Sequence, residues 1–357
     1  MIEIDGSQGE GGGQVLRSAL TLSLLTGLPF HIVNIRARRS KPGLAAQHLK
    51  SIDAAAAISK AEVQGAQLGS RELCFKPGGL RSGRYKFEIG TAGATTLILQ
   101  TILLPLSRAS SASTVIISGG THVPASPCYH YIELNWLPCL RQMGIDATLN
   151  LEQAGFYPQG GGRIQAIIRP SPRIRSLNLT QRGKLLDLRG ISAIANLPRS
   201  IAERQRRQAL LRLQELAALG NKIEPKIKIV ELLSPVKGTI LLLMAEFETG
   251  RACYFSLGEL GKPAEKVADE AVTRLAEFLE SEGAIDQYLA DQLLLPMSLA
   301  DGASALRTSR ITSHLLTNAE IIQLFLPVKI AIEGEMGASG FVRVSPQSST
   351  WINPVEK

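Results

Sequence analysis

The hydrophobic and polar positions in the first part of the chain switch between strand-like and helix-like spacing. Residues Ile2 to Ile4 read as a short strand, and after a glycine-rich loop an apolar stripe at helical spacing runs from about Gln14 to Thr26. A second strand is predicted from Phe30 to Ala37, a second helix from about Leu44 to Lys60, and a hairpin after that. The pattern predicts a unit of order strand, helix, strand, helix, strand, strand.

The same order of elements recurs along the chain. A second unit opens with a strand at Tyr85 to Ile89, a glycine loop and a helix to about Leu106, and its second helix spans about Pro127 to Met143. A third unit starts with a strand near Ile174 to Leu179, but its first helix comes only at about Asp286 to Leu299. The repeated order predicts three copies of one unit, the third of them interrupted.

The interruption has enough predicted strands and helices to form a unit of its own. We therefore predict an α/β (α+β) fold class, with three repeated βαβαββ units forming a large domain and a smaller inserted α/β domain. The large domain is expected to comprise residues 1–182 and 283–346, the inserted domain 183–282, and a C-terminal tail 347–357.

Composition limits the class of protein. The 357 residues are 45% hydrophobic and 20% charged, which allows a substantial core, and no run of about 18 or more uncharged apolar residues occurs. The acidic N-terminus does not read as a signal peptide, so we expect a cytoplasmic protein without membrane association. The four cysteines have no zinc-site spacing. The oligomeric state stays open, a homo-oligomer included.

The positive charge favours a polyanionic partner. The formal net charge is +8, although a soluble protein can be basic without such a partner. Within the inserted domain, the predicted helix from Ser200 to Leu219 carries several arginines that either hold RNA or form a solvated helix face: Arg204, Arg206, Arg207 and Arg212.

One histidine lies at a predicted helix start near the C-terminus. Thr312 or Ser313 can cap this helix, so that His314 falls in its first turn, where the helix dipole favours a neutral imidazole and an adjacent anion. A neutral imidazole has a lone pair for attack on phosphorus. A capping or core histidine is the alternative reading.

The loop before the first predicted helix has the features of an anion site. Its glycines let backbone N–H groups approach a phosphate, and Arg17 lies one turn inside the helix. A carboxylate beside a phosphate is repulsive unless a divalent cation lies between them, so Glu10 is a candidate ligand for Mg²⁺ or Mn²⁺, with a solvated loop glutamate as the alternative. Arg36 and Arg39 lie at the end of the second predicted strand. The residue pattern does not assign a role to His48 in the next predicted helix.

Six segments in sequence order resemble the RNA 3′-terminal phosphate cyclase family over almost the whole chain. The segments are GSQGEGGGQVLRSAL, IRARRSKPGLAAQHL, GTAGATTLILQT, GFYPQGGGRI, YLADQLLLPM and SHLLTN. The resemblance implies a large domain of three repeated units around a smaller inserted domain. It also implies an ATP-dependent ligase reaction in which a 3′-phosphate end of RNA becomes a 2′,3′-cyclic phosphate through a histidine–AMP intermediate and an RNA-adenylate.

The resemblance assigns a role to each candidate site residue. It implies that His314 is the nucleophile, that Glu10 binds the metal, and that ATP and a divalent metal, Mg or Mn, are the cofactors. The implied contacts to phosphate and the RNA end are Arg17, Arg36, Arg39 and His48. The implied nucleotide pocket consists of Gln100, Pro127, Tyr131, Tyr288, Asp291 and Gln292.

Two other functions compete with this reading. The first is a catalytically inactive, cyclase-like binding protein for RNA and ribosome assembly, which has no need of His314. The second is an enolpyruvyl-transferase type of enzyme, which also uses repeated units and arginines but requires neither a nucleophilic histidine nor an inserted domain. Transfer of AMP from labelled ATP to the protein separates the cyclase from both.

Overall fold

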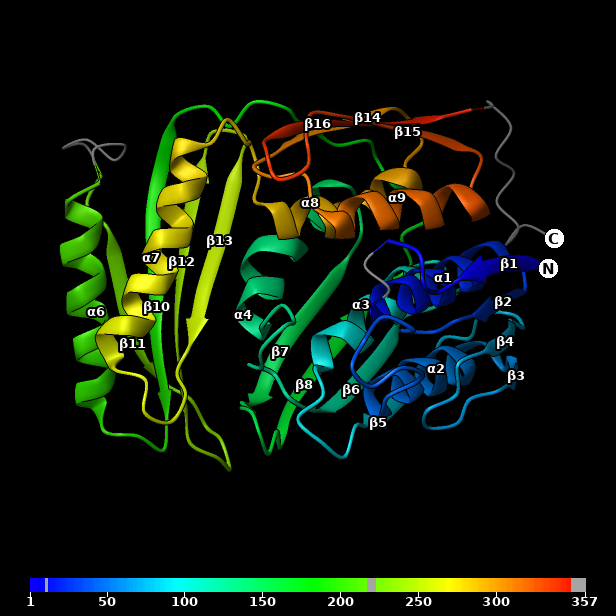
Figure 1. The fold of residues 1–357 in the computed structure, drawn as a ribbon, viewed down its shortest axis with the longest axis horizontal. Helices are drawn as coiled ribbons and strands as arrows, with labels where there is room; N and C mark the ends of the chain where they lie inside the picture. Colours follow the sequence, from blue (N-terminus) through cyan, green and yellow to red (C-terminus); the bar gives the residue numbers. More distant parts are fainter. Residues whose placement is uncertain (10–11, 217–222, 348–357) are drawn as a thin grey trace.

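A computed structural model describes residues 1–9, 12–216 and 223–347 (Figure 1). Its first unit consists of β1 (Ile2–Asp5), α1 (Gly13–Thr26), β2 (Phe30–Val33), α2 (Ala46–Ser59), β3 (Glu62–Gln64) and β4 (Leu73–Lys76). The second consists of β5 (Arg84–Glu88), α3 (Thr95–Ser107), β6 (Ser113–Gly119), the helical run α4 (Tyr129–Tyr131), η1 (Ile132–Trp136) and α5 (Leu137–Gln142), then β7 (Ala147–Gln153) and β8 (Gly162–Ile168). The third consists of β9 (Asn178–Leu179), α8 (Gln287–Ser298), β14 (Ser304–Thr308), α9 (Ser313–Phe325), β15 (Val328–Glu333) and β16 (Gly340–Pro346).

The three units share one sheet topology. The strand orders are β1-β2-β4-β3, β5-β6-β8-β7 and, read from β9, β9-β14-β16-β15. In each sheet the first two strands are parallel, because a helix connects them, and the last two strands join by antiparallel pairing. The mixed α/β class and the repeated element order predicted from the sequence are therefore present.

The segment between β9 and α8 forms a fourth sheet of different order. It contains β10 (Leu185–Ala195), α6 (Arg199–Gln214), β11 (Lys226–Glu231), β12 (Gly238–Phe247), β13 (Arg251–Leu257) and α7 (Ala264–Glu280), with strand order β11-β10-β12-β13. In Figure 1, α6 and α7 cover the outer face of this sheet. Single bridges through Ile285 connect the sheet to β14. The predicted domain boundaries stay a proposal.

Alternating residues of β12 divide between two hydrophobic cores. Leu241 and Leu243 pack with α6 and α7, whereas Ile240, Leu242 and Met244 belong to the main core of the three units. Successive side chains of a strand point to opposite faces of the sheet. The inserted sheet is thus buried on both faces, and one of these faces is turned towards the rest of the molecule.

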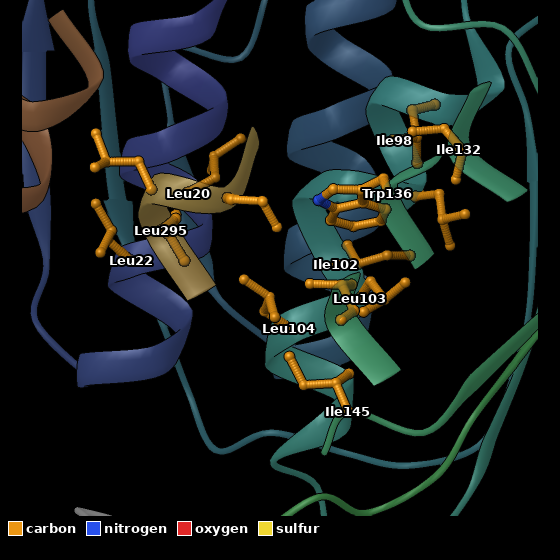
Figure 2. Close-up of a cluster of buried hydrophobic side chains, with 14 of the residues drawn as sticks. Leu20, Leu22, Ile98, Ile102, Leu103, Leu104, Ile132, Trp136, Ile145 and Leu295 are labelled. Atoms are coloured by element: carbon orange, nitrogen blue, oxygen red, sulfur yellow. The ribbon is translucent and has the colours of Figure 1, made fainter. Parts of the chain in front are cut away.

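The centre of the main core lies among the first helices of the three units. Figure 2 shows leucine and isoleucine side chains of α1 and α3 packed with Trp136 of η1 and Leu295 of α8. Each such side chain stabilises the fold by roughly 1.5–3 kcal/mol when it is fully buried. These contacts fix the starts of α1, α3 and α8 relative to one another, which matters because those starts carry polar side chains.

The structure shortens two predicted strands. The strand expected from Phe30 to Ala37 ends at Val33, because Asn34 and Arg36 have φ angles of 56° and 54°, a left-handed conformation that a strand cannot continue through. Arg36 and Arg39 therefore lie on a turn. Only Asn178–Leu179 of the strand expected from Ile174 pairs with a neighbour.

Two further expectations concern the ends of the chain and the membrane. The predicted tail lies, apart from Gln347, outside the described residues. Among the helices of residues 1–9, 12–216 and 223–347, none has both the length and the apolar character that crossing a bilayer requires.

Candidate functional site

A cavity of about 1080 Å³ lies between the inserted sheet and the helices of the three units. It is large enough for a nucleotide-sized ligand, since small-molecule pockets measure roughly 300–1,000 Å³. Eight of the side chains singled out from the sequence line this one cavity: Arg17, Gln100, Pro127, Tyr131, Tyr288, Asp291, Gln292 and His314.

His314 lies in the first turn of α9, as the sequence predicts. Thr312 is the N-cap residue, and its hydroxyl accepts a hydrogen bond from the Leu315 amide at 3.1 Å. The His314 side chain is exposed to solvent. The position at a helix N-terminus favours an anion beside this imidazole.

Gln14 connects His314 to Asp291. The Gln14 amide nitrogen donates to Asp291 Oδ1 at 2.6 Å, and its Oε1 faces His314 Nδ1 within hydrogen-bond distance. Because the amide oxygen can only accept, Nδ1 carries the proton when the ring is neutral. The lone pair of His314 then resides on Nε2.

A second set of hydrogen bonds holds Asp291. Asn318 of α9 donates to the backbone and side-chain oxygens of Asp291 at 3.1 and 3.2 Å, and Ser18 of α1 donates to Asn318 at 2.8 Å. Burial raises the pKa of Asp291, while His314, Gln14 and Arg17 act in the opposite direction. The network joins α1, α8 and α9 at their N-terminal ends.

Three positively charged or proton-donating side chains converge on the start of α1. A Cβ atom at Gly13 would lie 2.3 Å from His48 Nε2 and 2.9 Å from an Arg17 nitrogen, and a Cβ at Gly12 would lie 3.2 Å from an Arg39 nitrogen. Glycine at both positions therefore allows these groups to approach the backbone closely. A helix start with such neighbours is suited to a phosphate.

The protonation of His48 follows from its contacts. Its Nδ1 accepts a hydrogen bond from the Ala45 amide at 3.0 Å, so the neutral ring carries its proton on Nε2, the atom that faces Gly13. Burial, followed by the charges of Arg17 and Arg36, lowers the pKa of His48 to about 3. His48 is thus a neutral donor at physiological pH.

The surroundings of Arg17 differ from those of Arg36. Burial lowers the pKa of Arg17 to about 10, and Asp291 partly offsets this effect. Burial and then Arg39 lower the pKa of Arg36, whose guanidinium donates to the Gly43 carbonyl at 2.9 Å. Arg36, Arg39 and His48 lie beside the cavity lining, close to Arg17, and extend its positive charge.

Apart from Asp291, the side chains predicted for a nucleotide pocket line a further part of the same cavity. Gln100 of α3 donates to Gln292 of α8 at 2.8 Å, and the Pro127 carbonyl accepts from Thr96 at 2.7 Å. The Tyr288 ring is 47% exposed, whereas Tyr131 is only 1% exposed. Tyr288 therefore offers an open aromatic face, and Tyr131 forms a buried part of the wall.

The hydroxyl of Tyr131 belongs to a buried cluster around Asp286. This fully buried carboxylate accepts five hydrogen bonds, from Tyr131 Oη, Asn135 Nδ2 and the backbone amides of Cys253, Tyr288 and Leu289, at 2.8 to 3.2 Å. It caps α8 and connects that helix to η1 and to β13. Asp286 therefore positions the helix that carries Tyr288, Asp291 and Gln292.

Each of the three units has a histidine in the first turn of its second helix. These are His48 in α2, His130 in α4 and His314 in α9. His130 is buried, its Nδ1 lies 2.9 Å from His122 Nε2, and burial lowers its pKa to about 4. His122 Nδ1 in turn lies 2.7 Å from the Thr121 hydroxyl. This pair is a hydrogen-bonded part of the core.

Glu10, the predicted metal ligand, lies outside the described residues. Across the described parts of the chain, no three His, Cys, Asp or Glu side chains are grouped closely enough to hold a metal ion by themselves. The adjacent Gly9 packs against α9, since a Cβ there would lie 1.8 Å from Thr317 Oγ1. Gly9 thus lies next to the helix that carries His314.

Two of the four arginines singled out on α6, Arg204 and Arg212, form ion pairs with α7. Arg204 contacts Glu265 of α7 through two hydrogen bonds of 2.7 Å, and Arg212 contacts Asp269 at 3.0 Å. These contacts hold α6 against α7.

Three important residues were missed from the sequence. Gln14, Asn318 and Asp286 are ordinary polar residues, and apart from the cap that Asp286 forms on α8, their partners lie far away in the chain. A signal existed for Gln14, because Gln14, Arg17 and Ser18 share one face of α1 at i, i+3 and i+4 spacing.

Comparison with known proteins places this chain in a family. The family model for RNA 3′-terminal phosphate cyclase matches residues 8–332. Proteins named RNA 3′-terminal phosphate cyclase are 46% identical in Ralstonia nicotianae, over 95% of both chains, and 46% identical in Pseudomonas fluorescens, over 92% of this chain and 94% of the other. The relative in Koribacter versatilis is 43% identical over 94% of this chain and 92% of its own.

The chain therefore belongs to the RNA 3′-terminal phosphate cyclase family. It is an enzyme, a ligase of RNA processing, as the sequence analysis predicted. A solved structure, the enolpyruvyl transferase NikO from Streptomyces tendae, matches at 14% identity and a TM-score of 0.26, over 47% of this chain and 33% of that chain. A likeness this weak carries no argument.

Proposed function

We propose that the protein converts the 3′-phosphate end of RNA to a 2′,3′-cyclic phosphate in three steps driven by ATP. His314 Nε2 attacks the α-phosphorus of ATP, and pyrophosphate leaves. An oxygen of the RNA 3′-phosphate then attacks the phosphorus of the histidine–AMP and releases His314. The vicinal 2′-hydroxyl finally attacks the activated 3′-phosphate, AMP leaves, and the ring closes.

The observation that carries this proposal is the Asp291–Gln14–His314 chain. The carboxylate holds the Gln14 amide with its nitrogen towards Asp291, and the amide oxygen accepts the Nδ1 proton of the imidazole. A nucleophilic histidine needs one nitrogen protonated and oriented and the other free to attack. The same chain also gives Nδ1 a partner that accommodates the charge of the ring during attack.

Phosphate groups are assigned to the start of α1. Arg17 and Arg39 would form charge-assisted hydrogen bonds to phosphate oxygens, and His48 would donate from Nε2. Arg36 adds positive charge to the same region. We assign these residues to the triphosphate of ATP and to the RNA 3′-phosphate, which both approach His314 during the reaction.

The nucleoside of ATP is assigned to the wall formed by α3, α4 and α8. The exposed face of Tyr288 and the ring of Pro127 offer apolar surfaces to adenine, and Gln100 and Gln292 offer amide groups. Tyr131 forms a buried part of this wall and donates a hydrogen bond to Asp286.

A divalent metal, Mg²⁺ or Mn²⁺, is part of the proposal, with Glu10 as its ligand from the protein. Magnesium is usually held in proteins by one or two carboxylates together with substrate phosphates, so a single glutamate in a glycine loop fits this chemistry. The metal would offset the charge of the phosphates during adenylylation.

The decisive test uses a 3′-phosphorylated oligoribonucleotide with ATP and Mg²⁺. The expected product has an end that resists phosphatase, and labelled ATP leaves AMP on the protein. If folded protein produces neither the phosphatase-resistant end nor the AMP adduct, the proposed mechanism is contradicted. That outcome favours a binding role in RNA or ribosome assembly.

A further inference from the structure

The cavity that contains His314 extends well beyond the predicted nucleotide residues. We call its second part the β13 arm and define it by Phe156, Tyr157, Pro158, Lys237, Phe255 and Arg274. Its residues come from β13, from α7, from the turn before β12 and from the segment before β8. The cavity of about 1080 Å³ exceeds the roughly 300–1,000 Å³ of pockets for single small ligands. The residues predicted for the nucleotide pocket do not include those of the arm, so the arm is available to another part of the substrate.

The arm presents aromatic surface that the protein itself does not cover. Tyr157 is 68% exposed, and within the described chain its ring has no stacking or hydrogen-bond partner. Phe255 is half-buried and contacts Tyr131 edge to face, with ring centroids 6.5 Å apart. Open aromatic faces of this kind bind nucleic-acid bases by stacking, in a manner that tolerates any sequence.

The charges along the arm favour a polyanion. Lys237 is exposed and has no ion-pair or hydrogen-bond partner in residues 1–9, 12–216 and 223–347. Arg274 is also exposed and donates to the Phe255 carbonyl at 2.9 Å. Of the three carboxylates that line the whole cavity, Asp291 contacts Gln14, Glu270 is bound by Lys262 at 2.5 Å, and Glu259 is exposed.

We propose that the β13 arm binds the nucleotides that precede the 3′-terminal phosphate of the RNA. The inference rests on the proposed function, which brings the 3′-phosphate to His314 and so requires the preceding nucleotides to leave along a continuous path. Tyr157 and Phe255 stack with bases, and Lys237 and Arg274 contact the phosphates between them. The inserted domain thereby becomes part of the RNA site.

The test compares RNA lengths in the intact enzyme. We expect the KM for cyclisation to fall from a 3′-phosphorylated dinucleotide to an octanucleotide. Tyr157→Ala raises the KM for the octanucleotide by roughly tenfold, the effect of losing one stacked base, and affects the dinucleotide much less. Tyr157→Phe retains the ring and restores the low KM. AMP transfer from ATP to the protein is measured without RNA for each preparation. The cyclisation rate is then divided by this rate, which corrects for differences in active protein.

A matched pair of lysines tests the charge. Lys237→Ala should raise the octanucleotide KM and reduce its dependence on salt by about one phosphate contact. Lys228, an exposed lysine of β11 at the far edge of the same sheet, provides the control, and Lys228→Ala should change neither value.

Three results would overturn the assignment of the arm. They are a wild-type KM that does not depend on RNA length, an equal effect of Tyr157→Ala on the dinucleotide and the octanucleotide, and an equal effect of Lys228→Ala and Lys237→Ala. In each of these cases the protein still forms its AMP adduct. Failure of the proposed function is distinguishable, because wild-type protein would then form no adduct and cyclise no RNA of any length.

Discussion

Asp291 acts on His314 through the Gln14 amide, although Asp291 lies 23 positions and Gln14 lies 300 positions before His314 in the sequence. The carboxylate determines which end of the amide faces the imidazole, and the amide oxygen determines which ring nitrogen carries the proton. This arrangement resembles the logic of a catalytic triad, in which an acid orients a base through hydrogen bonding, with an amide inserted between the two.

Replacing Gln14 should change the reactivity of His314 while leaving the fold intact. Gln14→Ala removes the partner of Nδ1, and we expect AMP transfer to the protein to slow by roughly 10- to 100-fold, as for other orienting partners of histidine. Gln14→Glu places a carboxylate beside the imidazole, favours its protonated form and shifts the pH profile of the rate to higher pH. A profile identical to that of the wild type would contradict the orienting role.

His314→Asn should abolish the protein–AMP adduct. Asparagine cannot attack phosphorus, so ATP-dependent cyclisation falls by roughly 10⁴-fold or more, and the exposed position of the side chain leaves stability unchanged. Ring closure on a supplied RNA-adenylate should persist, because it depends on positioning of the 2′-hydroxyl. Loss of that step too would mean that His314 also takes part in it.

Arg39→Ala should reduce cyclisation by roughly 10- to 100-fold, since a charge-assisted hydrogen bond contributes about 1.5–3 kcal/mol. Arg39→Lys should recover only part of the rate, because an ammonium does not reproduce a two-pronged contact to phosphate. Arg84→Ala on the exposed surface of β5 is the matched control. Full activity of Arg39→Ala would remove Arg39 from the site.

Asp286→Ala should destabilise the protein by roughly 3–5 kcal/mol, measured as the free energy of unfolding in urea. The variant leaves five donors without their acceptor, in a region that no solvent reaches. Asp286→Asn, which keeps the shape and one acceptor oxygen, should lose less. Equal stability of the wild type and Asp286→Ala would exclude a structural role for this carboxylate.

Acid should destabilise the fold through its buried histidines. Burial lowers the pKa of His48 from 6.5 to about 3 and that of His130 to about 4. The unfolded chain takes up these protons below about pH 6.5 and the folded chain does not, so stability present above pH 6.5 is lost as the pH falls towards 4. Each histidine contributes up to about 1.4 kcal/mol per pH unit.

Urea unfolding at pH 7 and pH 5 measures this effect. His130→Gln should unfold with a smaller difference between the two pH values than the wild type, even if it is less stable at both. An unchanged difference would show that His130 is not one of the responsible groups.

Local patterns in the sequence carry much of the fold but less of the site. The spacing of apolar residues and the glycine loops predict the order of elements, and the cap at Thr312 places His314 correctly. The extension of β2 to Ala37 was wrong, because nothing in the residue pattern shows that Asn34 and Arg36 adopt left-handed backbone conformations. The role of Gln14 and the long-range contacts of Asp286 depend on partners from other parts of the chain, which no local pattern contains.

The second helix of each unit has a histidine in its first turn, and the three imidazoles differ in their surroundings. Repetition supplies the same helix start three times, so the fold offers three equivalent places for an imidazole. His48 and His130 are enclosed and stay neutral donors or acceptors, whereas His314 opens to the cavity and meets Gln14. The same helix start, placed in three different surroundings, thus gives two enclosed imidazoles and one that a ligand can reach.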